Sequence, residues 1–192
     1  MAEAAADTPR ERVRSILSGT VPRVGEPAKD TRTVPLLLAP MATLTHAGLR
    51  TLISEYGAPE LSWSEMISAE ALVGGTPYEE SYLNEDPAPD RLIFQLVGYT
   101  RERILAAAER LAMTGAAGLD FNMGCSAPHI VRKGGGIAWM HKAHETIRLL
   151  EELRSRLPDR SLSVKLRLGR TDDPDDLLSL CRHIQDTGVD FI

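Results

Sequence analysis

The sequence predicts an α/β protein of the (β/α)8 TIM-barrel class, and three observations lead to this fold class. Short apolar runs alternate with amphipathic helical stretches about six times after residue 33, which is typical of parallel strands joined by helical crossovers. Polar side chains recur where successive strands end, as in a barrel that builds its site from several strands. The first strand lacks the following G-x-G-x-x-G of the alternative, a doubly wound dinucleotide-binding sheet.

The composition indicates one ordinary globular core. Of 192 residues, 43% are hydrophobic and 26% charged, and the net charge of −5 argues against a dedicated nucleic-acid-binding module, although a local basic patch remains compatible with it. Cys125 and Cys181 are far apart, which argues against a disulfide framework or a structural metal site and indicates a reducing compartment. Without a long apolar run or an N-terminal apolar segment, we expect a cytoplasmic protein with no membrane span.

The N-terminal part is expected to divide at residue 32. Residues 1–32 are rich in alanine, proline and charge, and predict a flexible extension with at most a short helix near Thr8–Leu17. Residues 33–192 are expected to form the barrel portion. Val34–Ala39 is a continuous apolar run, so it predicts a strand that is buried on both faces.

The following units are placed by their caps and periodicity. Thr45 is the expected N-cap of a helix in which Leu49, Leu52 and Ile53 keep helical spacing, and which Gly57–Pro59 stop. The remaining expected elements up to the middle of the chain are a strand at Leu61–Met66, a short helix at Ser68–Leu72, a loop over 74–90, a strand at Leu92–Val97, and a helix from its cap Thr100 to near Gly115.

The second half continues this alternation. Its expected elements are a strand at Gly118–Asn122, a helix at Lys142–Leu157, a strand at Leu162–Arg167, a helix through Leu177 to Gly188, and the start of a sixth strand at Val189–Ile192. Lys165 and Arg167 share one face of the fifth strand, so both cations are expected to point into the sheet or barrel. The barrel is therefore expected to be truncated after about the start of strand six.

The stretch Leu119–Ser126 is the candidate site. A short buried strand runs into a glycine turn that presents Cys125 close to Asn122, and Lys133–Gly136 then predicts a long, mobile, partly basic loop. Catalytic groups commonly lie on loops that a rigid scaffold holds. The alternative is a strand, a turn and a free cysteine that acts as a small buried hydrophobe, the interpretation we give to Cys181.

Six stretches, in this order, resemble the successive signatures of the tRNA-dihydrouridine synthases. They are Leu38–Ala42, Ser64–Ser68, Phe94–Gly98, Asp120–Cys125, Lys133–Gly136 and Val164–Gly169, and the resemblance covers about residues 34–192. The resemblance implies an FMN-dependent TIM-barrel enzyme that reduces the C5–C6 bond of uridine in tRNA, with NADPH as reductant. Flavin N5 would give a hydride to C6 of the uracil.

The same resemblance implies that Cys125 is the general acid that protonates C5. An unperturbed thiol is mostly protonated at neutral pH, so it is competent as an acid without special tuning. Nucleophilic catalysis is less favoured, because the nearest histidine is His129 and no triad partner is evident.

The resemblance also assigns cofactor contacts. Pro40 and Met41 would lie against the isoalloxazine, and Gln95 and Lys165 would form hydrogen bonds with it. A cation near the N1–C2 edge stabilises the anionic reduced flavin, which is a physical reason for Lys165 to face inward. Asn122 would orient the flavin or the uracil. Alternatively, Lys165 reaches solvent along its aliphatic stem, and Asn122 only forms the turn.

For the substrate, the resemblance points to Asn122 together with two cations, Lys133 and Arg167. Arg167 either contacts substrate or pairs with Glu65. The basic loop would attract RNA phosphates, unless it is simply solvated. Its basic residues are His129, Arg132, Lys133, His141 and Lys142.

Some features depart from the family pattern. Ser126 stands where a proline often follows the cysteine, and Ala42–His46 replace the more usual glycine and acidic or amide residues after the first strand. By comparison with the family pattern, we expect these 192 residues to lack the flavin-contacting histidine, the phosphate loops after strands seven and eight, and the C-terminal helical domain. We expect a monomer. Two alternatives stay open: another FMN barrel acting on a free pyrimidine, and an inactive fragment without flavin.

Overall fold

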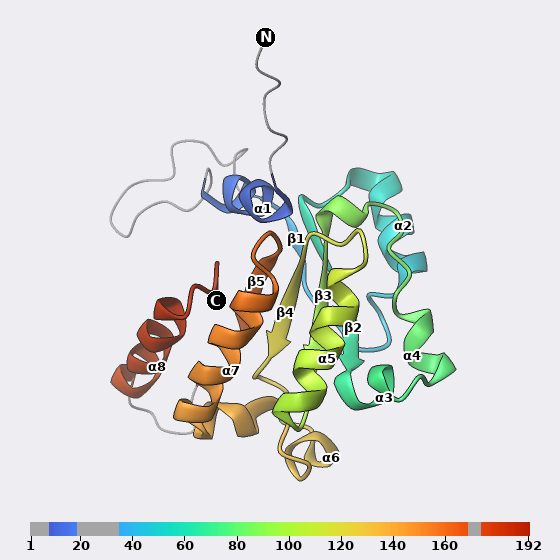
Figure 1. Ribbon diagram of the computed structural model, residues 1–192. Helices are drawn as coiled ribbons and strands as arrows, with labels where there is room; N and C mark the ends of the chain where they lie inside the picture. The colour runs from blue at the N-terminus through green and yellow to red at the C-terminus, as the bar shows by residue number, and fades with distance from the viewer. Residues whose placement is uncertain (1–7, 19–34, 169–173) are drawn as a thin grey trace.

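The computed structural model describes residues 8–18, 35–168 and 174–192. Its centre is one parallel sheet in which strand order follows chain order, as Figure 1 shows. The strands are β1 (Leu37–Leu38), β2 (Leu61–Ser68), β3 (Leu92–Val97), β4 (Gly118–Asn122) and β5 (Ser161–Lys165). A doubly wound sheet reverses its order at a switch point, whereas this sheet runs in one direction and curls like half of a barrel.

The helices are α1 (Pro9–Ser18), α2 (Ala47–Gly57), α3 (Ala69–Val73), α4 (Pro77–Ser81), α5 (Arg101–Ala112), α6 (Pro128–Val131), α7 (Ala143–Arg156) and α8 (Pro174–Asp186), with 3-10 turns η2 (Pro89–Arg91) and η3 (Gly136–His141). Helices α3, α5 and α7 cover the outer face of the sheet, whereas α1 lies at the amino-terminal ends of the strands and α6 at the opposite end. The predicted strands at β2, β3 and β4 and the helices at α3, α5 and α7 are confirmed to within a few residues.

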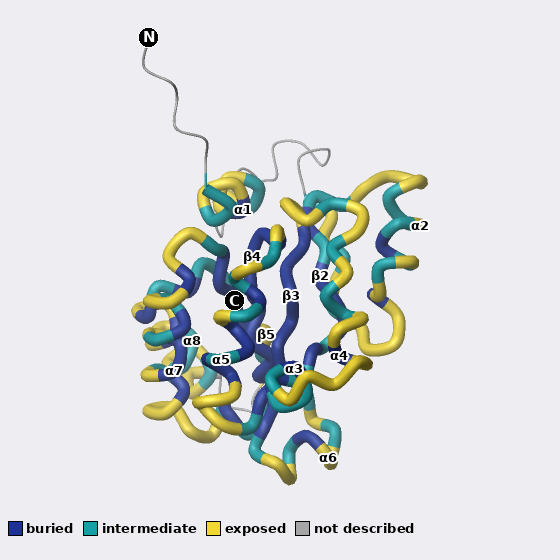
Figure 2. Tube along the Cα trace, turned by 45° about the vertical axis from the view of Figure 1, so that its right-hand side comes forward, coloured by how far each residue is buried: buried dark blue, intermediate teal, exposed yellow. Residues whose placement is uncertain are grey.

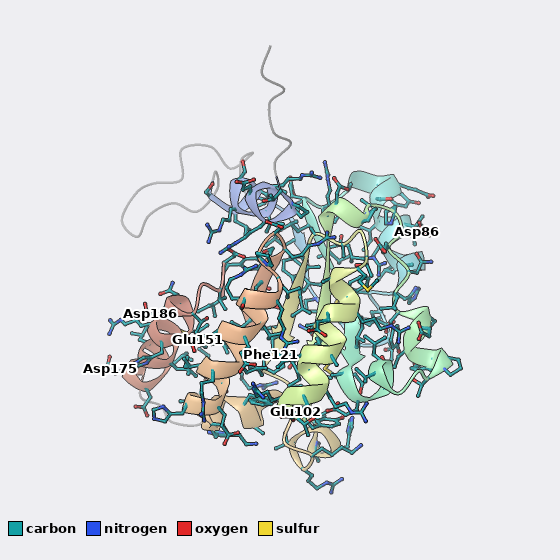
Figure 3. The ribbon with its side chains drawn as sticks, in the orientation of Figure 1. Asp86, Glu102, Phe121, Glu151, Asp175 and Asp186 are labelled. Atoms are coloured by element: carbon teal, nitrogen blue, oxygen red, sulfur yellow. The ribbon has the colours of Figure 1, made fainter. Side chains whose placement is uncertain are left out.

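The main core lies between the sheet and helices α3, α5 and α7. Strands β2 to β5 are mostly buried in Figure 2. Phe121 of β4 is fully buried and packs edge-on against Trp139, with ring centroids 5.7 Å apart; Figure 3 places Phe121 between α5 and α7. Burying such aromatic pairs stabilises the outer layer and leaves alternate residues of the same strands for the inner face.

A second, smaller core closes the amino-terminal ends of the strands. Helix α1 lies across this end, opposite α6, and its Val13 is fully buried against Leu61, Trp63 and Ile93. Residues 9–18 of the expected extension are therefore docked on the sheet rather than loosely held. The remainder of that extension, 1–7 and 19–32, lies outside the described residues.

The prediction for the first strand was wrong in extent and burial. Only Leu37 and Leu38 pair with β2, and Leu36 and Leu37 are 68% and 43% exposed. The reason is position: β1 is the edge of the described sheet, with a hydrogen-bonded neighbour on one side only. Val34, where the prediction began, lies outside the described residues.

Helix α2 also differs from its prediction. His46 is the N-cap, and its ring accepts a hydrogen bond from the Leu49 N–H, while Thr45 is buried. The inward residue is Arg50, only 3% exposed, whereas Leu52 is 50% exposed. Burial of Arg50 is tolerated because its guanidinium donates to three backbone carbonyls at 2.5–3.1 Å, those of Thr45, Asn84 and Asp86.

Loops that were expected to be open contain structure. The 74–90 segment holds α4 and η2, and the segment after Cys125, expected to be mobile, holds α6 and η3. Thr100 makes no side-chain cap on α5; the Glu70 carboxylate accepts from the Tyr99 N–H (2.8 Å) and the Thr100 N–H (3.4 Å) instead.

The last elements are shorter than expected. Strand β5 ends at Lys165, so Arg167 lies beyond it. The sixth strand is represented by a single parallel bridge between Phe191 and Ser163 on β5. That bridge keeps the sequential order of the sheet.

Candidate active site

The inner face of the sheet carries polar side chains toward the carboxyl ends of the strands. Register places Gln95, Asp120 and Ser163 in one row across β3, β4 and β5, and Asn122 beside Lys165 in the next row. Because side chains alternate across a strand, the intervening Leu119 and Phe121 face the helices instead. Sequence and register therefore gather five polar groups on one face.

These groups form a continuous hydrogen-bonded chain, which we call the inner polar chain: Ser163, Asp120, Gln95 and Asn122. Ser163 Oγ donates to Asp120 Oδ1 (2.6 Å), Gln95 Nε2 donates to Asp120 Oδ2 (2.7 Å), and Asn122 Nδ2 donates to Gln95 Oε1 (2.9 Å). All four residues are buried. Buried polar groups that are mutually satisfied in this way hold a single arrangement of side chains.

Asp120 is the acidic member of the inner polar chain, and it is buried. Burial raises the pKa of its carboxyl above the ordinary value, and the hydrogen bonds from Ser163 and Gln95 and the charge of Lys165 act in the opposite direction. Asp120 was part of a quoted motif but not of the predicted site. The signal was available: an acid inside an apolar strand, two residues before Asn122, shares the inner face with it.

Cys125 follows β4 and is held through its backbone. Its N–H donates to Asn122 Oδ1 (2.9 Å), and its carbonyl accepts from the Ile137 N–H (2.9 Å). The neighbouring Gly124 carbonyl accepts from Arg167 Nε (3.0 Å). The structure thus brings Asn122 and Cys125 together as predicted. Arg167 contacts the cysteine loop through the Gly124 carbonyl.

Gly136 is needed where the chain returns to the cysteine. It has φ +57°, and a Cβ at this position would clash with the Cys125 carbonyl. We expect Gly136→Ala to cost more than about 2 kcal/mol and to raise the alkylation rate of Cys125, because strain and clash both act there. Gly75→Ala is the matched control: Gly75 has φ +71° and open space around its Cβ position, so only backbone strain of about 1–2 kcal/mol applies.

Urea unfolding and iodoacetamide labelling of both glycine variants test this. Equal losses of stability, with Cys125 labelling unchanged, would show that the contact between Gly136 and the cysteine loop is unimportant.

An aromatic wall stands beside the cysteine loop. Lys133 Nζ lies 5.3 Å from the centroid of the Tyr99 ring, and Trp139 Nε1 donates to the Gly98 carbonyl (2.9 Å). Burial, followed by the charges of Glu70 and Cys125, raises the pKa of Tyr99. These contacts hold the segment from Lys133 to Trp139 against Gly98 and Tyr99, which follow β3.

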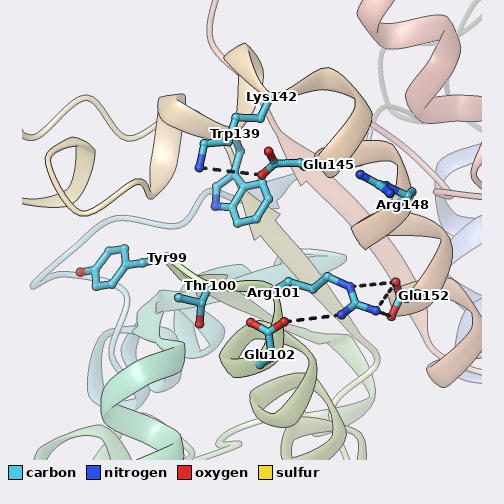
Figure 4. A pocket seen from close by; sticks show the side chains of 9 residues that line it. All are labelled: Tyr99, Thr100, Arg101, Glu102, Trp139, Lys142, Glu145, Arg148 and Glu152. Carbon is cyan, nitrogen blue, oxygen red and sulfur yellow. Dashed lines mark hydrogen bonds and ion pairs between the residues drawn. The ribbon is translucent and has the colours of Figure 1, made fainter.

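Two pockets flank this wall at the carboxyl end of the sheet. One, of about 430 Å³, lies between the amino-terminal ends of α5 and α7; Figure 4 shows its mixed charges, including the Arg101–Glu152 ion pair. The other, of about 630 Å³, lies over α6 and η3 and is lined by Ser126, Pro128, Val131, Arg132, Ile137, Ala138, His141 and Lys142. We call the second the basic groove. His129 and Lys133 are exposed nearby on the same loop.

The remaining predicted site residues lie at different distances from this centre. Lys165 is exposed at the end of β5, on the inner face beside Asn122. Pro40 and Met41 follow the edge strand β1, and Met41 is 36% exposed. Their loop is folded on itself, because the Thr45 hydroxyl accepts from the Met41 N–H and donates to its carbonyl.

Over the part of the chain that the structure describes, none of the helices has both the length and the apolar character required to traverse a bilayer.

Comparison with known proteins gives consistent results. The family model described as dihydrouridine synthase matches residues 37–192. A probable tRNA-dihydrouridine synthase of Helicobacter pylori is 30% identical over 135 residues, which are 70% of this chain and 41% of that protein. One of Rhodobacter capsulatus is 29% identical over 159 residues, 82% of this chain and 48% of that protein.

A Xenopus tropicalis protein named tRNA-dihydrouridine(47) synthase [NAD(P)(+)]-like is 28% identical over 158 residues, 82% of this chain and 24% of that protein. The chain thus spans less than half the length of these curated relatives. Among solved structures, a Coccidioides immitis protein assigned as a deoxyribose-phosphate aldolase superposes with a TM-score of 0.52 at 16% identity, covering 92% of this chain and 67% of that one. This likeness concerns the fold alone.

Proposed function

The chain belongs to the dihydrouridine synthase family, and from that premise we propose that the protein reduces the C5–C6 bond of uridine in tRNA. The observation that carries the proposal is the position of Cys125. It follows β4 at the carboxyl end of a curled parallel sheet, tied to an inward amide, with an exposed lysine on the next strand. The carboxyl ends of such strands are where barrels place catalytic groups.

In this proposal Cys125 is the general acid that delivers a proton to C5 of the uracil. The backbone contacts of the cysteine fix its loop without using the thiol, so the side chain remains for the substrate. General acid catalysis by a positioned side chain contributes about 10²–10⁴-fold to a rate. The proposed setting is a (β/α)8 barrel of which the described sheet forms an arc.

The residues present fit FMN as the cofactor. Lys165 offers an exposed ammonium beside Asn122, and Gln95 keeps one amide hydrogen beyond its bond to Asp120, so donors converge as the polar edge of a flavin requires. Pro40 and Met41 would supply an apolar surface for the ring. Bound FMN, reduced by NADPH, would supply the hydride for C6.

The tRNA would approach over the cysteine loop. Asn122 would orient the uracil, Lys133 would meet phosphates, and Arg167 would contact substrate while its Nε holds the Gly124 carbonyl. The basic groove presents Arg132, His141 and Lys142 on the same side. Cations attract the RNA backbone without regard to sequence.

The two free cysteines support a reducing, cytoplasmic setting, and we propose a monomer.

The test is a reduction assay with the purified protein, FMN, NADPH and either unmodified tRNA or free uridine. We expect NADPH oxidation and a gain of two hydrogen atoms in uridine, detected by mass spectrometry, with tRNA only. Reaction with the free pyrimidine would favour a different FMN barrel enzyme. Failure to bind flavin, in a protein that is folded by circular dichroism, would contradict the proposed activity of this chain.

A further inference from the structure

Between the cysteine loop and Asp120, the hydrogen bonds of the inner polar chain all run in one direction. From the cysteine loop inward, the Cys125 N–H donates to Asn122, Asn122 donates to Gln95, and Gln95 donates to Asp120. The Gly124 N–H also donates to Asn122 Oδ1 (3.1 Å). Every donor therefore points toward Asp120, and the two side-chain amides are in series between backbone N–H groups and a carboxyl group.

The two ends of the chain determine this direction. A backbone N–H can only donate, and an ionised carboxylate can only accept. A primary amide has an accepting oxygen and a donating NH2, so its orientation decides which of the two faces each neighbour. Gln95 must turn its NH2 toward Asp120, which leaves its carbonyl for Asn122. Asn122 must then turn its NH2 toward Gln95, which leaves its carbonyl for the N–H groups of the cysteine loop.

Protonation of Asp120 would not reverse the chain. Its two oxygens have different partners: Oδ1 faces the Ser163 hydroxyl, and Oδ2 faces Gln95. A hydroxyl group both donates and accepts, so a proton on Oδ1 can be donated to Ser163 while Oδ2 still accepts from Gln95. The direction thus depends on an acceptor opposite Gln95, whatever the charge of the acid.

We propose that Asp120 is a positioning residue that sets the orientation of the Gln95 and Asn122 amides and thereby holds the Cys125 loop in place. It acts through two intermediate side chains and does not itself touch the cysteine. A flipped Asn122 would present its NH2 to the Gly124 and Cys125 N–H groups, so the loop would lose its acceptor. The geometry is independent of the proposed function; only its consequence for catalysis depends on it.

Nuclear magnetic resonance of the unmodified protein tests the direction first. We expect a through-hydrogen-bond coupling between the Cys125 amide nitrogen and the Asn122 side-chain carbonyl carbon, together with slow exchange of the Gln95 NH2 protons. Rapid exchange of those protons, or absence of the coupling in a folded protein, would overturn the proposal. These readouts need neither flavin nor tRNA, so they succeed or fail separately from the proposed activity.

Variants of nearly equal size then separate positioning from packing. Asp120→Leu removes the acceptor and should speed hydrogen exchange of the Cys125 amide by about tenfold or more. In Asp120→Asn, the new NH2 can donate to the Ser163 hydroxyl while the remaining oxygen accepts from Gln95. We therefore expect the Cys125 amide to exchange nearly as slowly as in the unmodified protein. Ser163→Ala removes another partner of Asp120 and should leave the Cys125 amide protected.

A purely structural role predicts a different pattern, in which Cys125 exchange follows global stability in all three variants. That result, or equal exchange in the Leu and Asn variants, would contradict the proposal. If Asp120→Leu does not fold, the coupling in the unmodified protein and the Ser163→Ala spectrum still decide the question.

Discussion

Replacing Cys125 with alanine is expected to lower the rate of the proposed uridine reduction in tRNA by about 10²–10⁴-fold, the usual contribution of a positioned general acid. The variant should fold normally, because the loop is held through the cysteine N–H and carbonyl, which alanine retains. The side chain is only half-buried, so its removal leaves little cavity. The measurement is single-turnover formation of dihydrouridine with saturating tRNA.

Cys181→Ala is the matched control for this prediction. Cys181 is also half-buried, but it lies on α8, and burial raises the pKa of its thiol. We expect the Cys181→Ala variant to form dihydrouridine at a rate within about twofold of the unmodified protein, because substitutions away from a site usually have small effects. If the Cys125 variant kept more than about a tenth of the rate, another group would have to be the acid.

Much of the fold was predictable because apolar periodicity reports burial. The β3 run is apolar except for Gln95, and the strand is buried on both faces, as that pattern predicts. Strand β4 alternates Leu119 and Phe121 with Asp120 and Asn122, and it is buried along its whole length as well. The same rule failed for the first strand, because a run such as Leu36–Leu38 does not reveal that it lies at an edge. In α2 the buried residue is Arg50 and not one of the periodic apolar residues, because the backbone carbonyls of Thr45, Asn84 and Asp86 accept from its guanidinium.

From local sequence pattern alone, contacts in the candidate site were predictable only between residues that are close in sequence, and the family resemblance supplied the distant members such as Gln95 and Lys165. Asn122 and Cys125 are three residues apart, so a strand followed by a turn was enough to bring them together. Gln95 meets Asp120 from another strand, and that contact depends on the register of β3 against β4. Glu70 on α3 accepts from the Tyr99 N–H, and that contact depends on how α3 packs beside the end of β3. The pattern of one strand does not show which residue of the neighbouring strand lies beside it.

Replacing Asp190 with asparagine is expected to cost about 3–5 kcal/mol of unfolding free energy, the largest stability effect that we predict. The Asp190 side chain is fully buried, and its oxygens accept from Arg10 (2.9 Å), Arg14 (2.7 Å), Arg154 (3.0 Å) and the Leu162 N–H (2.9 Å). Burial and the charge of Arg10 lower the pKa of Arg154, as expected where cations crowd one carboxylate.

Without that carboxylate, three arginines would face one another with little compensation, and α1 would lose the ion pairs of Arg10 and Arg14 that join it to the segment after α8. Asp90→Asn provides the control, because Asp90 on η2 pairs with Arg12 of the same helix α1 at 3.1 Å while both side chains are more than 40% exposed. Exposed pairs contribute about 0–1 kcal/mol. Urea unfolding followed by tryptophan fluorescence measures both losses, since Trp63 packs in the small core beneath α1. Equal losses in the two variants would mean that α1 is held by Val13 and its apolar neighbours alone, and that the buried charge cluster adds no net stability.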